Sequence, residues 1–258
     1  MAKPVLGAQL YTVREFTKTI EGVAQTFKKI RDIGYRQVQI SGFGPVDPKD
    51  VAKALEDSGL QCVITHMPWD RFLQEIDGVI ETHQAWNCKH TAIGGLFTED
   101  YFGIPGLRKF LGELPPVLEK LEAAGLDFSY HNHSHEFVKF EGETWLARLF
   151  DAPEAARVNA ELDTYWVQHG GGDPMQWIRR CARRMPVLHV KDMIITTDRT
   201  QRYAAIGEGN LNWPAIMQAA EEVGVESCCV EQDDCYGEDP FDCLARSYRF
   251  LHEQFGLI

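Results

Sequence analysis

Short runs of apolar and β-branched residues alternate along the chain with longer segments of helical periodicity. Apolar runs of about four to eight residues predict buried strands, and amphipathic segments longer than about ten residues predict helices. We expect strands at Val5–Leu10, Gln37–Ile40, Gln61–Thr65, His90–Gly94, Asp127–His131, Arg157–Asp163, Pro186–Val190 and Ser227–Glu231. We expect helices at Thr19–Asp32, Pro48–Ser58, Arg71–Trp86, Leu107–Ala124, Gly142–Phe150, Pro174–Arg183, Trp213–Val223 and Pro240–Glu253.

Glycine marks the end of several expected helices, because it adopts the left-handed conformation that closes a helix. The glycines concerned are Gly34, Gly59, Gly125 and Gly224. In the fourth expected helix, Pro115 and Pro116 predict an interruption or a kink. Segment Thr196–Asn212 is expected to be a long connection.

Eight strand–helix units in 258 residues most simply close into a parallel barrel. The alternative is an open doubly wound sheet, which in a dinucleotide-binding protein would carry a glycine-rich fingerprint after the first strand. The sequence there is QLYTVR, without that fingerprint. We therefore expect a single α/β domain spanning residues 1–258, a (β/α)₈ TIM barrel.

Charge and cysteine content narrow the class of protein. The chain has 26 Lys and Arg against 38 Asp and Glu, a net charge of −12, which argues against a nucleic-acid partner. Its seven cysteines form no CxxC pair, and no apolar segment is long enough to cross a membrane or to resemble a leader peptide. These features predict a cytoplasmic protein without a membrane partner.

Polar side chains close most of the expected strands. In a barrel these positions point into one shared bowl, and burying such groups unpaired costs about 1–3 kcal/mol each. The side chains are Gln9, Gln39, His66, His131 with His133, Asp163, His189 and Glu231.

Four of these residues suit a divalent metal ion, namely His131, Asp163, His189 and Glu231, each from a different unit. Imidazole and carboxylate ligands favour Mn²⁺, Zn²⁺, Co²⁺ or Fe²⁺ over Ca²⁺. Such an ion would polarise sugar oxygens while a neighbouring carboxylate removes a proton next to a carbonyl. Trp69 would provide an apolar wall for a sugar ring.

Plainer explanations compete with this one. A histidine in an apolar run is more often a hydrogen-bonded core residue, although Lys191 and Asp192, two and three residues after His189, favour a polar barrel mouth. The run from His131 to Glu136 could instead be a solvated loop, and Trp69 could be ordinary core packing.

Seven segments together resemble the xylose-isomerase-like TIM barrels, the sugar phosphate isomerase/epimerase superfamily. They are GAQLYTVR at 7–14, HMP at 66–68, YHNH at 130–133 with EF at 136–137, ELDTYW at 161–166, LHVKDM at 188–193, GEG at 207–209 with Trp213, and VEQD at 230–233. Because they run from the first strand to the last, the resemblance covers essentially the whole chain.

The resemblance implies one divalent metal ion at the strand ends, Mn²⁺ first, with Zn²⁺, Co²⁺ and Mg²⁺ as alternatives. By position, Asp163, His189 and Glu231 match three of the usual four ligands, and Glu231 would double as the catalytic acid/base. Lys191 would join it and His131 as a catalytic residue. The resemblance further implies substrate contacts from His66, Glu208 and Arg202. From their positions at the strand ends and the barrel mouth, we also expect Gln9, His133 and Trp69 to contact the substrate.

One departure from the family affects the chemistry. Its epimerases carry a glutamate ligand at the end of the fifth strand, which is also the second of two catalytic carboxylates. Here that position is His131, and the nearest downstream carboxylate is Glu136. Either His131 replaces the glutamate as a ligand, or Glu136 folds back into the site.

The leading hypothesis is therefore a metal-dependent isomerase or epimerase of carbohydrate metabolism, acting on a sugar, sugar phosphate or keto-polyol. A lyase or dehydratase of keto-sugars or inososes on the same site is the alternative. A non-catalytic carbohydrate-binding barrel is a third reading, and a DNA-repair endonuclease conflicts with the acidic charge. The identity of the substrate and the oligomeric state, a homo-oligomer among the options, stay open.

Overall fold

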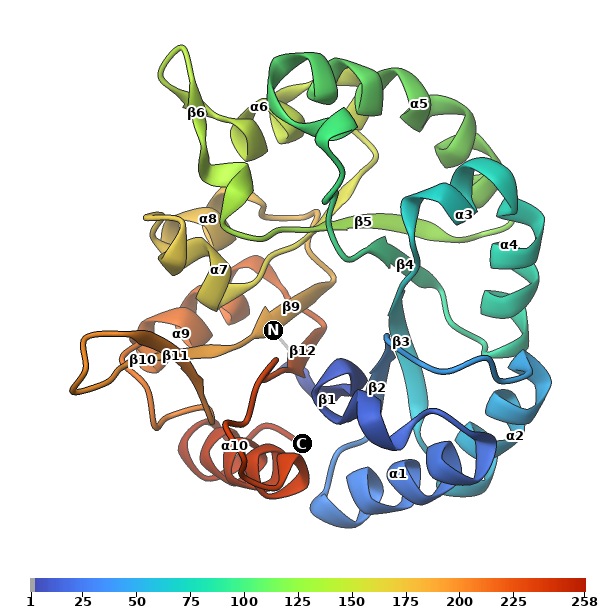
Figure 1. Ribbon diagram of the computed structural model, residues 1–258, viewed down its shortest axis with the longest axis vertical. Coiled ribbons are helices and arrows are strands. Elements are labelled where there is room, and N and C mark those ends of the chain that lie inside the picture. The colour runs from blue at the N-terminus through green and yellow to red at the C-terminus, as the bar shows by residue number, and fades with distance from the viewer. Residues whose placement is uncertain (1–2) are drawn as a thin grey trace.

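Eight parallel strands form the inner wall of the molecule in a computed structural model that describes residues 3–258 (Figure 1). They are β1 (Val5–Gln9), β2 (Gln37–Ile40), β3 (Gln61–His66), β4 (His90–Ile93), β5 (Asp127–His131), β8 (Asn159–Glu161), β9 (Val187–Val190) and β12 (Ser227–Val230). Their hydrogen-bonded order is β8-β5-β4-β3-β2-β1-β12-β9. The expected (β/α)₈ TIM barrel is confirmed.

The two end strands of this sheet, β8 and β9, meet at a narrow seam. An isolated parallel bridge joins Asp163 to His189, and the His189 N–H donates to the Leu162 carbonyl at 2.9 Å. This bridge almost closes the barrel, and it lies at the residues that the sequence marks as metal ligands.

Helices surround the strands on the outside (Figure 1). They are α1 (Ile20–Ile33), α2 (Pro48–Ser58), α3 (Trp69–Gln74), α4 (Ile76–Ala85), α5 (Gly103–Ala123), α6 (Trp145–Asp151), α7 (Thr164–His169), α8 (Pro174–Arg180), α9 (Trp213–Val223) and α10 (Pro240–Phe255). Gly59 and Gly224 end α2 and α9 in the left-handed conformation, as expected.

Two helices differ from the sequence-based expectation. The helix expected at Arg71–Trp86 is divided at Glu75, whose φ of −134° is not helical, into α3 and α4. Helix α5 instead continues through Pro115 and Pro116. Both prolines lie on the partly exposed side of the helix, where water can satisfy the carbonyls that lose their backbone donors.

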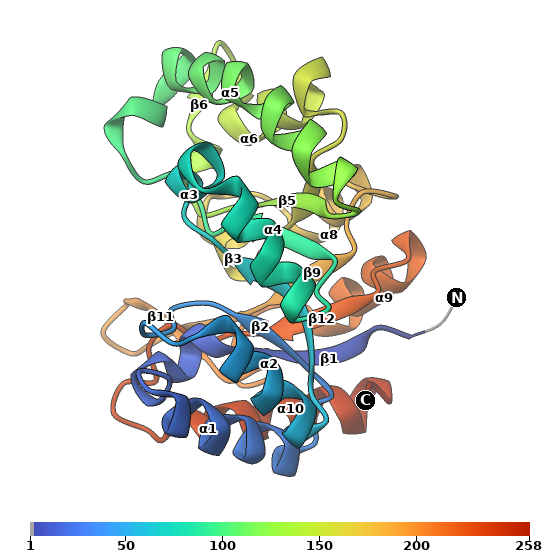
Figure 2. The ribbon, with the colours of Figure 1, turned by 90° about the vertical axis from the view of Figure 1, so that its right-hand side faces the viewer.

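The expected connection Thr196–Asn212 contains a strand. This strand, β11 (Gln201–Ala204), pairs antiparallel with β10 (Asp192–Ile195). The resulting hairpin and the C-terminus lie on opposite sides of the barrel (Figure 2). The remaining short elements are β6 (Lys139–Phe140), β7 (Glu143–Thr144), η1 (Leu10–Phe16), η2 (Glu99–Tyr101), η3 (His135–Phe137) and η4 (Pro153–Ala155).

The barrel interior divides into an apolar layer and a polar layer. The apolar layer contains a small cluster from strands on opposite sides of the barrel: Val63, Ile64, Ala92, Val187 and Cys229. The polar layer consists of buried side chains at the carboxyl ends of the strands, described below. Across residues 3–258, no helix is both long and apolar enough to span a membrane.

Candidate active site

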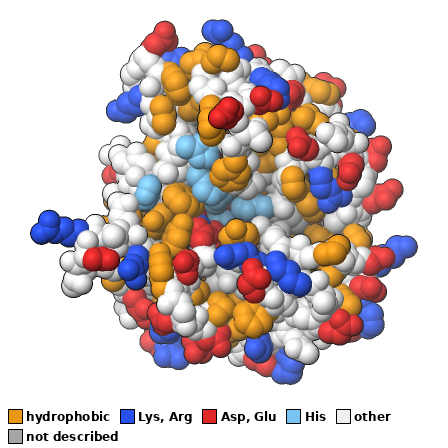
Figure 3. All heavy atoms as spheres, viewed as in Figure 1, with side chains coloured by type: hydrophobic (Ala, Val, Ile, Leu, Met, Phe, Trp, Pro, Cys, Tyr) orange, Lys and Arg blue, Asp and Glu red, His pale blue; other side chains and the backbone are white. Residues whose placement is uncertain are grey.

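Polar side chains from most of the barrel strands converge at the floor of one hollow. Histidine side chains gather in the hollow at the middle of the face shown in Figure 3, with hydrophobic side chains around them. A continuous cavity of about 1120 Å³ opens there. Five ionisable residues at its inner end are His66, His131, Lys191, Glu231 and Asp233.

Glu161 is fully buried behind this floor, between two histidines. Its Oε2 accepts a hydrogen bond from His66 Nε2 at 2.8 Å, and its Oε1 lies 3.1 Å from His189 Nε2. Burial alone would raise the pKa of Glu161, but His189 and His66 lower it to about 2. The carboxylate is therefore ionised and fixes the orientation of both imidazole rings.

The two ring nitrogens of His189 face different partners. Nε2 donates to Gln39 Oε1 at 2.5 Å and contacts Glu161. Nδ1 faces the other way, 3.4 Å from Glu231 Oε2 and 3.7 Å from Asp163 Oδ2. A histidine whose one nitrogen is held by a carboxylate and whose other nitrogen faces two carboxylates has the usual arrangement of a metal ligand.

The Lys191 ammonium also lies against these carboxylates. Its Nζ is 2.6 Å from Glu231 Oε2, 3.1 Å from Asp163 Oδ2 and 3.1 Å from Asp233 Oδ1. Burial by itself would lower the pKa of Lys191, but the three carboxylates raise it well above its ordinary value. The side chain is therefore a fixed positive charge at the floor of the cavity.

Glu231 and Asp233 respond differently to the same lysine. Burial would raise the pKa of Glu231, but Lys191 and His189 hold it well below its ordinary value, so this carboxylate is ionised. Burial and the neighbouring Glu231 raise the pKa of Asp233 to about 6. Two carboxylates with separated pKa values on one wall are a common feature of acid/base sites.

His131 and His133 follow one another along the end of β5. The His131 ring lies 4.4 Å from the His189 ring between centroids, and burial, His189 and His66 lower its pKa well below the ordinary value. His131 is therefore a neutral imidazole at the cavity wall. His133 also lines the cavity, and its ring packs edge-to-face on Phe97.

Gln9 supports the site from β1. Its side-chain oxygen accepts from the Tyr11 N–H at 3.1 Å, and its Nε2 lies 3.4 Å from His66 Nδ1. This side chain is fully buried, so it acts on the cavity through the orientation of His66.

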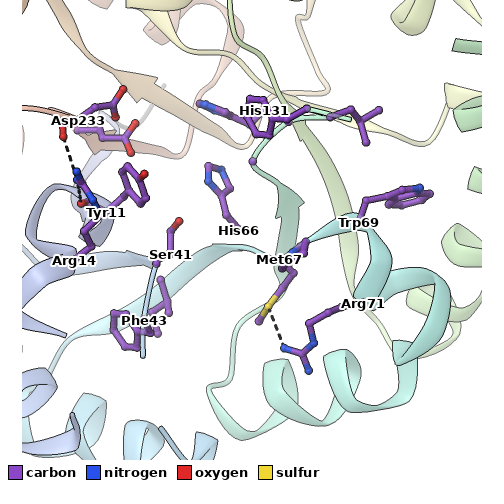
Figure 4. A pocket seen from close by; sticks show the side chains of 18 of the residues that line it. Tyr11, Arg14, Ser41, Phe43, His66, Met67, Trp69, Arg71, His131 and Asp233 are labelled. Atoms are coloured by element: carbon purple, nitrogen blue, oxygen red, sulfur yellow. Dashed lines mark hydrogen bonds between the residues drawn. The ribbon is translucent and has the colours of Figure 1, made fainter. Parts of the chain in front are cut away.

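Glu136 and Trp69 are turned away from the convergent group. The Glu136 carboxylate accepts from the Tyr130 hydroxyl at 2.9 Å and from the His133 N–H at 2.8 Å, so it braces the loop after β5 and does not fold back. Trp69 reaches the cavity, but its indole N–H donates to Glu113 at 2.9 Å and its ring points away from His66 (Figure 4).

Glu208 and Arg202 lie outside the set of residues that line the cavity. Glu208 is exposed and pairs with Arg246 at 2.8 Å, while Arg202 lies over the Tyr236 ring. The GEG segment is instead organised from below by Asp192, whose carboxylate accepts from the Gly207 and Gly209 N–H groups. Asp192 therefore fixes the conformation of the loop that contains Gly207 and Gly209.

The donor atoms at the floor fit a divalent metal ion. Ligand atoms of Asp163, His189 and Glu231 lie within 4.8 Å of one another, and a second group of His66, His131, Glu161 and His189 meets the same limit. Within residues 3–258, the buried ring nitrogens His189 Nδ1 and His131 Nδ1 have no hydrogen-bond partner, and within hydrogen-bonding distance Asp163 Oδ2 has only its ion pair with Lys191. Unsatisfied buried donors and acceptors of this kind are expected where an ion completes the site.

Comparison with known proteins assigns the family. Residues 27–251 match the sequence profile of the family described as xylose isomerase-like TIM barrel. The chain belongs to the xylose isomerase-like TIM barrel family. No curated protein sequence matches the chain.

Solved structures share the fold of this family member at low sequence identity. A sugar phosphate isomerase/epimerase from Parabacteroides distasonis is 22% identical, with a TM-score of 0.78 over 100% of this chain and 96% of that one. D-allulose 3-epimerase from a Methylomonas species, solved with D-allulose, is 12% identical, with a TM-score of 0.72 over 99% and 98%. The IOLI protein, solved with a zinc atom, is 13% identical, with a TM-score of 0.73 over 96% and 97%.

Two residues of the site were not singled out from the sequence. Glu161 shares a strand face with Asp163, and that alternation was the available signal. Asp233 follows Glu231 by two residues and belongs to the VEQD segment. Glu161 is the last residue of β8, but the strand expected from the sequence ran on to Asp163. Asp233 lies beyond the end of β12, so a search limited to the expected strand ends passes over both residues.

Proposed function

We propose that the protein is a divalent-metal-dependent isomerase or epimerase of keto-sugars, sugar phosphates or keto-polyols. The observation that carries the proposal is the contact between the Lys191 ammonium and the Glu231 carboxylate at the floor of an open cavity. An ionised carboxylate next to a fixed cation can take a proton from a carbon beside a carbonyl while the cation stabilises the enolate oxygen. The D-allulose and sugar phosphate enzymes of the same fold support this substrate class.

Asp163, His189 and Glu231 would hold the metal ion, with His131 at the position where the epimerases of the family carry glutamate. The bound ion would supply Lewis-acid polarisation of the sugar oxygens. Carboxylate and imidazole ligands are compatible with Mn²⁺, our first choice, and with Zn²⁺, Co²⁺ or Mg²⁺. The IOLI protein of the same fold, solved with a zinc atom, supports a metal ion in this chain.

Glu231, Lys191 and Asp233 have different roles in the proposed proton transfer. Glu231 accepts the proton from carbon once the substrate oxygen takes over its hydrogen bond from Lys191. Lys191 then donates to the developing oxyanion, and Asp233, in contact with Lys191 at 3.1 Å, holds the ammonium in place. His66, oriented by Gln9 and Glu161, binds a sugar hydroxyl.

The cytoplasmic location of the protein stays a prediction.

A lyase or dehydratase is the second candidate, because His131 stands where the epimerases of the family carry their second catalytic carboxylate. Epimerisation through two carboxylates needs a base on each face of the sugar, whereas this site offers an imidazole at the second position. Elimination needs one base and one proton donor for the leaving oxygen. Mass analysis of the product separates the candidates, because elimination releases water or an alcohol.

Replacement of Glu231 tests the proposal. Purified protein loaded with Mn²⁺ and incubated with a panel of ketoses in deuterated water is expected to incorporate deuterium next to the carbonyl. Glu231→Gln should abolish this exchange while its circular dichroism spectrum stays unchanged. Glu238→Gln is the matched control, because this exposed carboxylate pairs with Arg246 outside the cavity. Exchange at the wild-type rate in Glu231→Gln would exclude Glu231 as the base.

A further inference from the structure

The cavity is larger than the polar floor requires. Its volume of about 1120 Å³ exceeds the range of roughly 300–1,000 Å³ that holds drug-sized ligands. The ionisable residues described above line its inner end, and a monosaccharide bound to them leaves the remainder unfilled. The remainder extends between the loop after β2 and helices α3 and α4.

The apolar side chains that line this outer lobe include Phe43, Val46, Met67 and Trp86. Figure 4 shows Phe43 facing Met67 across the open space, with His66 at the inner end. Met67 and Trp86 are buried, and Phe43 and Val46 are half-buried against the core. Trp86 also donates from its indole N–H to the Pro48 carbonyl at 2.8 Å, which fixes the ring at the far end of the lobe.

Two of the polar side chains beside the outer lobe, Arg71 and Thr82, already have partners, while Asp70 and Ser41 line the cavity at its exposed edge. The Arg71 guanidinium pairs with Glu75 at 3.1 Å and lies 3.7 Å from the Met67 sulfur. The Thr82 hydroxyl donates to the Gly78 carbonyl at 2.8 Å. The lobe therefore offers apolar contact area in preference to hydrogen bonds, which favours an apolar ring over a second sugar or a phosphate.

We propose that the outer lobe is a subsite for an aryl substituent, so that the substrate is a keto-sugar that carries an aromatic group. The sugar end of this proposal rests on the proposed function, because the ionisable floor must receive the sugar. Aromatic and thioether side chains pack well against a flat ring, and the ring buries apolar surface that water otherwise contacts.

A matched pair of ligands tests the subsite by binding alone. Methyl and phenyl β-D-glucopyranoside differ only in the aglycone, and we expect calorimetry to show at least tenfold tighter binding of the phenyl glycoside. Val46→Trp fills the lobe and should remove this preference without changing the affinity for the methyl glycoside. Val138→Trp is the control, because Val138 is exposed outside the cavity. If Val46→Trp does not fold, Phe43→Ala should reduce the preference instead.

Equal affinity for the two glycosides, or an unchanged preference in folded Val46→Trp, would overturn the subsite. Tighter binding of glucose 6-phosphate than of phenyl glucoside would also overturn it, in favour of a phosphate near Arg71. These measurements need no turnover, so they are independent of the exchange assay with Glu231→Gln. Preference for the phenyl glycoside, together with no deuterium exchange into any ketose of the panel, would refute the proposed chemistry and support the subsite.

Discussion

The Lys191 ammonium and the Glu231 carboxylate are in direct contact, 2.6 Å apart, and Glu231 is also one of the residues that would hold a metal ion. Asp163 Oδ2 is likewise 3.1 Å from this ammonium and belongs to the same ligand group. A divalent ion and Lys191 therefore draw on the same negative charge.

Removal of the ammonium should increase the affinity for metal. Lys191→Met takes a positive charge away from Asp163 and Glu231, so we expect Mn²⁺ to bind about tenfold more tightly by calorimetry. The same variant should lose deuterium exchange, because no donor faces the enolate oxygen. Lys53→Met, which removes an exposed lysine paired with Asp57, is the control. Unchanged or weaker Mn²⁺ binding in Lys191→Met would contradict the competition.

Neutralising Glu161 should weaken the site without touching the substrate. Glu161→Gln keeps the shape of the side chain but removes the charge that orients His66 and His189. Loss of such a partner of a metal-binding histidine lowers metal affinity by about 10–100-fold. Titration with Mn²⁺ measures this effect, and wild-type affinity in a folded Glu161→Gln variant would refute the orienting role.

Asp192 should matter for stability more than for chemistry. Its buried carboxylate accepts hydrogen bonds from the Met193, Gly207, Gly209 and Leu211 N–H groups and from the Trp213 indole. Asp192→Ala leaves these donors without partners, so we expect a loss of about 3–5 kcal/mol in the free energy of unfolding in urea. The exposed Asp57→Ala should stay within about 0.5 kcal/mol. A change below about 1 kcal/mol in Asp192→Ala would contradict this account.

His83 should make the fold sensitive to mild acid. Burial, more than any neighbouring charge, lowers the pKa of this imidazole to about 4 in the folded protein. In the unfolded chain the same imidazole has a pKa of about 6.5. Between these values the unfolded state binds more protons, so stability falls as pH decreases from about 6.5 to about 4. The contribution is about 2 kcal/mol between pH 7 and pH 5. Urea unfolding at both pH values measures it, and His83→Gln should reduce the pH dependence.

The alternation of apolar and helical segments was sufficient to predict the barrel and the strand ends that carry His66, Asp163 and His189. Roles that depend on partners far away in the chain could not be predicted in this way. Glu208 belongs to a GEG segment, but its carboxylate pairs with Arg246 from α10, outside the cavity. Similarly, the proline pair of α5 was expected to break a helix, and only the tertiary packing shows that its lost hydrogen bonds face solvent.

At the narrow seam between β8 and β9, the same two residues serve both the closure of the barrel and the candidate metal site. The bridge residues Asp163 and His189 supply both the backbone pairing that nearly closes the barrel and the side chains that converge at its floor. Substitutions that conserve backbone conformation can tune the chemistry, but proline at His189 would also remove the N–H that pairs with the Leu162 carbonyl and so open the seam. A disruptive substitution at this seam is therefore expected to reduce both the stability of the barrel and the function of the site. At other strands the two properties can be altered separately.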